Sequence, residues 1–194
     1  DPESGLISID RLKEKLESAA KHNELPKILV PVHFAGQSCS MKEISDLSNR
    51  YNFHVIEDGS HALGGRYLGE PVGNCRHSDI TVFSFHPVKL ITTAEGGVAI
   101  TNQKKLREKM NLLRSHGITR DPALMIDNSA GNWYYEQLTL GFNYRLTDVQ
   151  AALGISQLKR LDQFIQKRHQ VANLYDSLLE DLPVSPLRRM PNVY

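Results

Sequence analysis

The lysine whose surroundings suggest chemistry is Lys89, which lies in the apolar part of segment 84–97, just past an expected strand end. Desolvation and neighbouring cations lower the pKa of a lysine amine, and a Schiff-base amine requires that change. The plainer alternatives are a surface lysine that extends from a loop, a core histidine at His86 and a simple turn at Gly96 and Gly97. Segment 84–97 is therefore one of three candidate site segments.

The second candidate is Asp58, which follows the apolar run 54–57 where the carboxyl end of a strand is expected. Ligands of open α/β sheets bind just beyond such strand ends. A carboxylate there can pair with a cationic ring nitrogen and keep it protonated. His61 stands three residues later, so one helical turn would put both side chains on one side. The alternative is an ordinary helix N-cap, the commoner role of an Asp after a strand.

The third candidate segment, 141–148, contains Asn143 and Arg145 just before an expected helix start. Free N–H groups at a helix N-terminus favour phosphate, so these side chains could contact an anion. The alternative is a loop that leads into a well-capped helix. None of the three segments is decisive alone, and the inference depends on their joint occurrence.

The elements that must position these residues are strands alternating with helices, which favours a mostly parallel α/β sheet. Segment 28–34 is continuously apolar and predicts a strand buried on both faces. Ser40 with Glu43, and Thr147 with Gln150, predict capping boxes at two helix starts. The other expected strands are 54–57, 80–85 and 98–101, and the other expected helices include Ile9–Ala19 and Leu106–Leu113. A polar loop is expected at about 118–140. The helix after Thr147 is expected to reach about Leu182 with a bend.

Composition excludes several classes of protein. The chain has 194 residues, 40% of them hydrophobic, and a net charge of +1, which would not gather nucleic acid or an anionic membrane. No apolar run approaches the ~20 residues that span a bilayer, and the first residues do not resemble a signal peptide. Cys39 and Cys75 lack the spacing of a disulfide framework or zinc site, so we expect reduced thiols, a cytoplasmic protein and no metal.

Taken together, the segments resemble the DegT/DnrJ/StrS family of pyridoxal-phosphate (PLP) dependent sugar aminotransferases. The resemblance covers essentially the whole chain and is carried by Pro31–Gln37 (PVHFAGQ), Ile56–Asp58 (IED), Ser84–Gly97 (SFHPVKLITTAEGG) and Gly141–Gly154 (GFNYRLTDVQAALG). It implies the α/β PLP-dependent transferase fold type I. It also implies that residues 1–146 are part of the large PLP-binding domain and that 147–194 are a connecting helix and the start of the small domain.

The resemblance assigns roles by position. Lys89 would be the catalytic residue that forms the Schiff base with PLP, and Asp58 would pair with the pyridinium nitrogen. His61 would lie near the phenolic oxygen and Ser84 near the phosphate. Asn143 would reach the cofactor phosphate of a neighbouring subunit, since these enzymes resemble homodimers with shared sites.

The resemblance also suggests the reaction. Segments 58–65, 114–120 and 133–137 are similar to those of transaminases in pseudaminic acid biosynthesis. The implied substrates are L-glutamate and a UDP-linked 4-keto-6-deoxy N-acetylhexosamine. A sibling enzyme that makes perosamine or a 3-amino sugar, and an inactive PLP-binding protein, remain alternatives. The family's phosphate-binding turn and ring-stacking aromatic residue precede the matched segments, so we expect this chain to be a fragment without a complete site.

Overall fold

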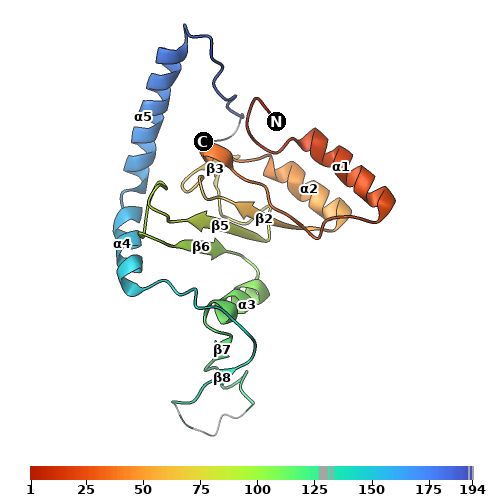
Figure 1. The fold of residues 1–194 in the computed structure, drawn as a ribbon, viewed down its shortest axis with the longest axis vertical. Helices are drawn as coiled ribbons and strands as arrows, with labels where there is room; N and C mark the ends of the chain where they lie inside the picture. The colour runs from red at the N-terminus through yellow and green to blue at the C-terminus, as the bar shows by residue number, and fades with distance from the viewer. Residues whose placement is uncertain (127–130, 132, 192, 194) are drawn as a thin grey trace.

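A four-stranded sheet forms the centre of the chain in the computed structural model, which describes residues 1–126, 131, 133–191 and 193. The strand order is β1 (Ile28–Leu29), β2 (His54–Asp58), β5 (Ile80–Ser84) and β6 (Gly97–Ile100). The first three strands are parallel and β6 runs antiparallel to β5. This arrangement confirms the mostly parallel α/β sheet, and Figure 1 shows it with helices on both flanks.

Two helices pack on the β1–β2 end of the sheet and form the main core with it. Helix α1 (Ile9–His22) begins at Ser8, whose side chain accepts a hydrogen bond from the Arg11 amide, and α2 (Met41–Tyr51) lies against α1. Their apolar residues recur at helical spacing, so each helix presents one apolar face to the other elements. The buried residues of this core are Leu6, Leu12, Leu16, Cys39, Met41, Ile44, Leu47, Phe53 and Val55.

The expected strand 28–34 differs from the observed one. Only Ile28–Leu29 forms a strand, Val32 makes an isolated bridge with Asp58, and Phe34–Gly36 is a short 3-10 helix. Expected burial on both faces is also wrong, because Ile28 and Val30 are each 51% exposed. The physical reason is that β1 is an edge strand with one covered face, and Pro31 has no N–H for a continuous ladder.

The two predicted capping boxes have different outcomes. Thr147 accepts a hydrogen bond from the Gln150 amide and the Gln150 side chain accepts from the Thr147 amide, so this box is confirmed. Ser40 does precede α2, but its side chain makes no capping hydrogen bond. The Ser40 backbone has φ −70° and ψ 70°, which departs from the extended conformation usual at an N-cap.

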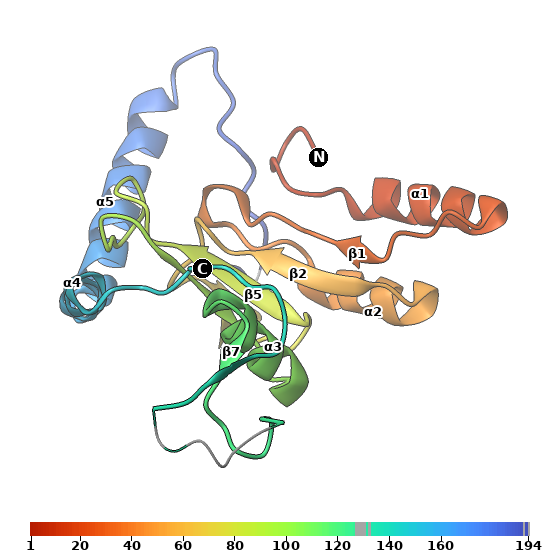
Figure 2. The same cartoon turned by 60° about the horizontal axis from the view of Figure 1, so that its bottom comes forward.

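The second half of the chain is more open. Helix α3 (Lys104–Arg114) follows β6, and the expected polar loop contains a hairpin of β7 (Ile118–Thr119) with β8 (Glu136–Gln137). The predicted bend separates α4 (Asp148–Leu158) from α5 (Leu161–Leu179). Figures 1 and 2 show α4 and α5 on the flank opposite α1 and α2. A small hairpin of β3 (Arg66–Tyr67) with β4 (Glu70–Pro71) completes the strands.

The segment after α5 returns to the N-terminal end of the chain. The Arg188 amide donates to the Glu3 carbonyl at 2.7 Å, and the Met190 amide donates to Gln37 Oε1 at 2.6 Å. None of the helices built by the described residues has both the length and the apolar character that a bilayer crossing requires.

Candidate active site at the carboxyl edge of the sheet

Asp58 is the last residue of β2 and lies at the carboxyl edge of the parallel strands. Its Oδ1 accepts a hydrogen bond from the Ser60 amide at 3.0 Å. Burial raises the pKa of Asp58, but the hydrogen bonds from Ser60 and the nearby His61 and Lys89 outweigh it, so the pKa lies below its ordinary value. The carboxyl group is therefore ionised at neutral pH, as a partner for a cationic ring nitrogen must be.

The residues after Asp58 form a turn instead of a helix, so the N-cap interpretation of Asp58 is wrong. The Gly59 amide donates to the Val82 carbonyl at 2.9 Å, and the Ala62 amide closes a turn onto the Gly59 carbonyl at 2.8 Å. A Cβ at position 59 would lie 2.8 Å from the Phe83 ring, so only glycine permits this close approach. His61 is exposed, with its ring centroid 6.1 Å from that of Phe34.

Lys89 lies in a loop whose two ends are held together beyond β5. The Phe85 amide donates to the Gly96 carbonyl at 2.8 Å, and the Thr93 amide donates to the Phe85 carbonyl at 3.0 Å. Within the loop the Lys89 amide donates to the His86 carbonyl at 2.9 Å. The Lys89 side chain is half-buried, and within the described part of the chain it forms no ion pair. These features leave the amine available to a ligand.

Ser84 and His86 shape the start of this loop. Ser84 Oγ accepts a hydrogen bond from the His86 amide at 3.4 Å, and His86 Nδ1 accepts one from the Val88 amide at 3.3 Å. The His86 ring is exposed, so it is not the core histidine that the alternative interpretation required. Both side chains bond to the loop's own backbone and so help to set the direction in which Lys89 leaves it.

Helix α4 packs directly against the Lys89 loop. Gln150 Nε2 donates to the Glu95 carbonyl at 2.8 Å, from the same side chain that completes the capping box. A Cβ at Gly154 would lie 2.8 Å from Thr93 Cγ2, so this glycine permits the contact between helix and loop. The loop is thus fixed from two directions, by the sheet and by α4.

Asn143 lies in the segment that leads into α4. Its segment forms an antiparallel bridge with Ser115, and its side chain is exposed. Within the described residues, no hydrogen bond or ion pair joins Asn143 to Asp58, His61, Ser84 or Lys89. Four of the five predicted site residues therefore share the carboxyl edge of the sheet, and Asn143 makes no such bond to them among the described residues of one chain.

An open groove of about 550 Å³ lies beside the site, lined by His61 and by Leu90, the neighbour of Lys89. Its other walls are α5 and the returning segment after it. The basic residues that line the groove are His61, Arg168, His169, Arg188 and Arg189, and its described lining residues include no Asp or Glu. Arg188 pairs with Asp1 and Glu3, and Arg189 pairs with Asp176. Arg168 adds a positive charge to the groove that suits an anionic ligand.

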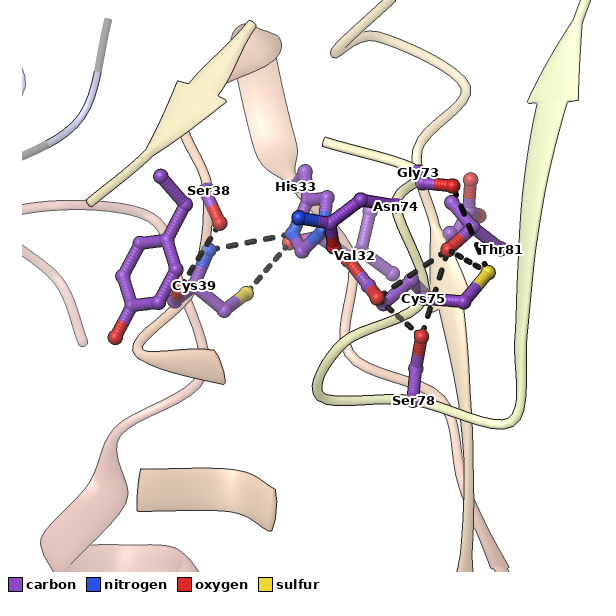
Figure 3. A network of polar contacts seen from close by, with 12 residues as sticks. Val32, His33, Ser38, Cys39, Gly73, Asn74, Cys75, Ser78 and Thr81 are labelled. Atoms are coloured by element: carbon purple, nitrogen blue, oxygen red, sulfur yellow. Dashed lines mark hydrogen bonds and ion pairs between the residues drawn. The ribbon is translucent and has the colours of Figure 1, made fainter. Parts of the chain in front are cut away.

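Beneath the site lies a buried polar network that we did not predict from the sequence. His33 Nε2 lies 2.9 Å from Glu57 Oε2, and Glu57 Oε1 accepts hydrogen bonds from Ser78 and Thr81. Figure 3 shows His33 between Cys39 on one side and Ser78 and Thr81 on the other. Burial raises the pKa of Glu57, but the hydrogen bonds from His33, Ser78 and Thr81 lower it more. The feature of the sequence that could have indicated this network is His33, a histidine inside the apolar run 31–34.

The donor set of the site fits PLP. An aldehyde cofactor with a basic ring nitrogen requires a lysine amine, an ionised carboxylate and a hydroxyl. The structure offers a half-buried lysine amine that has no ion pair with any described residue, an ionised carboxylate at a strand end and a strand-end hydroxyl. By contrast, the described residues contain no group of three or more His, Cys, Asp or Glu side chains arranged to hold a metal ion.

Comparison with known proteins is consistent with this chemistry. The model of the DegT/DnrJ/EryC1/StrS aminotransferase family matches residues 1–193. A UDP-4-amino-4,6-dideoxy-N-acetyl-beta-L-altrosamine transaminase of Campylobacter jejuni is 45% identical over 172 residues, which are 88% of this chain and 43% of that protein. A GDP-perosamine synthase of Caulobacter vibrioides is 40% identical over 156 residues, 80% of this chain and 38% of that protein.

A solved structure gives the same result for the fold. Helicobacter pylori PseC, an aminotransferase involved in the biosynthesis of pseudoaminic acid, superimposes with a TM-score of 0.81 at 37% identity. The superposition covers 92% of this chain and 44% of PseC. The chain thus spans less than half the length of these relatives.

Proposed function

Because this chain belongs to the DegT/DnrJ/EryC1/StrS aminotransferase family, we propose that it supplies the cofactor-binding centre of a PLP-dependent nucleotide-sugar aminotransferase. The observation that carries the proposal is the meeting of Asp58 and the Lys89 loop at one sheet edge, close enough for the two charges to interact. Residues 1–146 would be part of the large PLP-binding domain, and residues 147–194 would be the connecting helix and the start of the small domain.

Each site residue has a distinct task in this proposal. Lys89 would hold the resting cofactor covalently through Nζ, and as a free amine it would move a proton to and from the sugar carbon that receives the amino group. Asp58 would bind the ring nitrogen and keep its proton in place. His61 would lie near the phenolic oxygen, and Ser84 would bind the phosphate. When bound, PLP supplies an electron sink that these side chains cannot provide.

The proposed substrates are L-glutamate as amino donor and a UDP-linked 4-keto-6-deoxy N-acetylhexosamine as acceptor, giving a 4-amino sugar for pseudaminic acid biosynthesis. The 45% identity to the Campylobacter jejuni transaminase supports this choice, and the basic groove beside His61 suits an anionic substrate. The second candidate is a perosamine-type reaction, favoured by the 40% identity to the Caulobacter vibrioides synthase. Mass spectrometry of products from a panel of nucleotide-linked 4-keto sugars separates the two.

We also propose a homodimer with shared active sites, because the Asn143 side chain is exposed and has no hydrogen bond or ion pair to the Lys89 loop within the described residues. In that assembly Asn143 would contact the cofactor phosphate in the partner's site. A cytoplasmic location agrees with Cys39 and Cys75, which are both buried free thiols.

The test of the cofactor assignment is chemical. Borohydride reduction of the holoprotein should fix the phosphopyridoxyl group on the peptide that contains Lys89, and glutamate should bleach the absorbance of the bound cofactor. A label on the peptide of Lys42 or Lys104 would refute the assignment of Lys89. A cofactor band that glutamate leaves unchanged would favour the inactive PLP-binding alternative.

A further inference from the structure

We propose that His33 is a positioning residue for Asp58, acting through its buried hydrogen bond to Glu57 and its backbone bond to the end of β2. The proposal rests on the proposed function, in which Asp58 binds the cofactor ring. Within the described part of the chain, His33 has no hydrogen bond or ion pair to the Lys89 loop, so its effect on the site must pass through β2.

The backbone of Asp58 is held on both sides by the segment that contains His33. The Asp58 amide donates to the Pro31 carbonyl at 2.9 Å, and the His33 amide donates to the Asp58 carbonyl at 3.0 Å. Beyond Leu29 the regular ladder has already ended, and these two bonds, which make up the Val32–Asp58 bridge, are the backbone bonds that join the described segment to the end of β2. The position of Asp58 therefore depends on where residues 31–33 are fixed.

The His33 ring fixes that segment. The Cys39 amide donates to Nδ1 at 3.2 Å, so Nε2 carries the ring proton and donates to Glu57 Oε2 at 2.9 Å. The His33 side chain is fully buried and that of Glu57 is 6% exposed, so water cannot replace either bond. Leaving a buried partner unsatisfied has a large cost, which keeps the ring in one orientation.

Glu57 extends the network to the neighbouring strand. Its other oxygen accepts from Ser78 and Thr81, and Thr81 belongs to β5, which leads to Ser84 and the Lys89 loop. Successive side chains of a strand point to opposite faces, so Glu57 faces the network while Asp58 faces the site edge. A shift of Glu57 must therefore move Asp58, its neighbour in the chain. A misplacement of about 1 Å at a reacting centre can cost on the order of 10²-fold in rate.

The test compares two variants of similar size in the full-length protein. His33→Gln keeps a donor at the place of Nε2 and so keeps the bond to Glu57. His33→Asn keeps an acceptor for the Cys39 amide but loses that bond. We expect His33→Asn to weaken PLP binding, measured by titration of the apoprotein, and to lower kcat roughly 10- to 100-fold. His33→Gln should stay within a few-fold of the parent in both measurements. Equal effects of the two variants overturn the proposal.

A double-mutant cycle with Asp58→Asn separates positioning from a general loss of stability. If His33 acts through Asp58, His33→Asn should change kcat and PLP affinity much less in the Asp58→Asn background. Additive losses overturn the proposal. Ile44→Val, a core substitution at a side chain that makes none of the network's hydrogen bonds, is the control for lost stability alone. A kcat loss for Ile44→Val equal to that of His33→Asn also counts against positioning. If His33→Asn does not fold, Thr81→Val removes one hydrogen bond to Glu57, and its several-fold effect should likewise vanish in the Asp58→Asn background.

The cycle also distinguishes the two proposals. Near-normal turnover of the single variant Asp58→Asn refutes the role of Asp58 and with it the proposed site. A large loss for Asp58→Asn with an independent loss for His33→Asn refutes only the positioning role.

Discussion

The two halves of this chain use apolar residues at the same helical spacing with different results. Every buried apolar side chain of the described residues lies between Leu6 and Ile91, and α1 and α2 contribute five of them. In contrast, α3, α4 and α5 bury no residue, and Leu174 and Leu178 of α5 are 58% and 64% exposed. Apolar residues at helical spacing give a helix an apolar face, but that face is buried only where another element packs against it.

The difference explains where the polar groups of each half can act. In the packed half, the side chains of His33 and Glu57 are buried, and each of their buried polar atoms has a hydrogen-bond partner that fixes its orientation. In the open half, the side chains of Asn143 and Arg145 are exposed. The candidate site lies where the halves meet, with Asp58 anchored in the packed half and the Lys89 loop held by α4.

The largest effect is expected when two inactive variants are mixed, which tests whether the open half contributes to the active site of another subunit. In the full-length protein, Lys89→Ala and Asn143→Ala should each have little activity. Random mixing of the two makes half the dimers mixed, each with one intact site, so activity should recover to about a quarter of the wild type. Subunit exchange is verified by mass spectrometry. Recovery no higher than the mean of the two parents would place Asn143 outside the partner's site.

The second prediction compares how much one apolar side chain in each half contributes to the stability of the fold. Ile44→Ala removes a fully buried side chain and should lower the free energy of unfolding by about 2–5 kcal/mol. Leu178→Ala, on the exposed face of α5, should change it by no more than about 0.5 kcal/mol. Urea unfolding of the 194-residue chain measures both. Similar losses for the two variants would mean that α5 is packed in solution.

The third prediction concerns the pH dependence of the packed half. The folded-state pKa of Glu57 lies below its ordinary value of 4.5, so its ionised form stabilises the fold above that value. This stability should be lost as the pH falls through the folded-state pKa. Glu57→Gln removes the titration, so its free energy of unfolding should fall less steeply than that of the wild type below pH 4.5. Parallel acid curves for the two proteins would contradict this role of Glu57.

The smallest expected effect compares the two helix starts. Thr147→Ala removes a formed capping box and should lower the free energy of unfolding by about 1 kcal/mol. Ser40→Ala removes a side chain that makes no capping bond, so it should change the free energy of unfolding by no more than a few tenths of a kcal/mol. A loss at Ser40 equal to that at Thr147 would show that the Ser40 cap forms in solution.

The sequence by itself determined the local features of this protein. Apolar spacing located the helices and the four strands, and the motifs around Asp58, Lys89 and Asn143 identified the family. These features depend on residues close in the chain, whose geometry follows from the helical and strand periods. The Thr147 box belongs to the same class, since its two partners are three residues apart.

Tertiary structure decided which surfaces are covered and which polar groups meet. It left one face of segment 28–34 exposed, since nothing in the sequence of that segment says whether both faces have a neighbour. It joined His33 to Glu57, which is 24 residues away in the chain, and it joined Glu57 to Thr81 of β5. It also paired the Asn143 segment with Ser115, 28 residues earlier in the chain. Such contacts depend on how the chain packs in space, and local spacing carries no information about that packing.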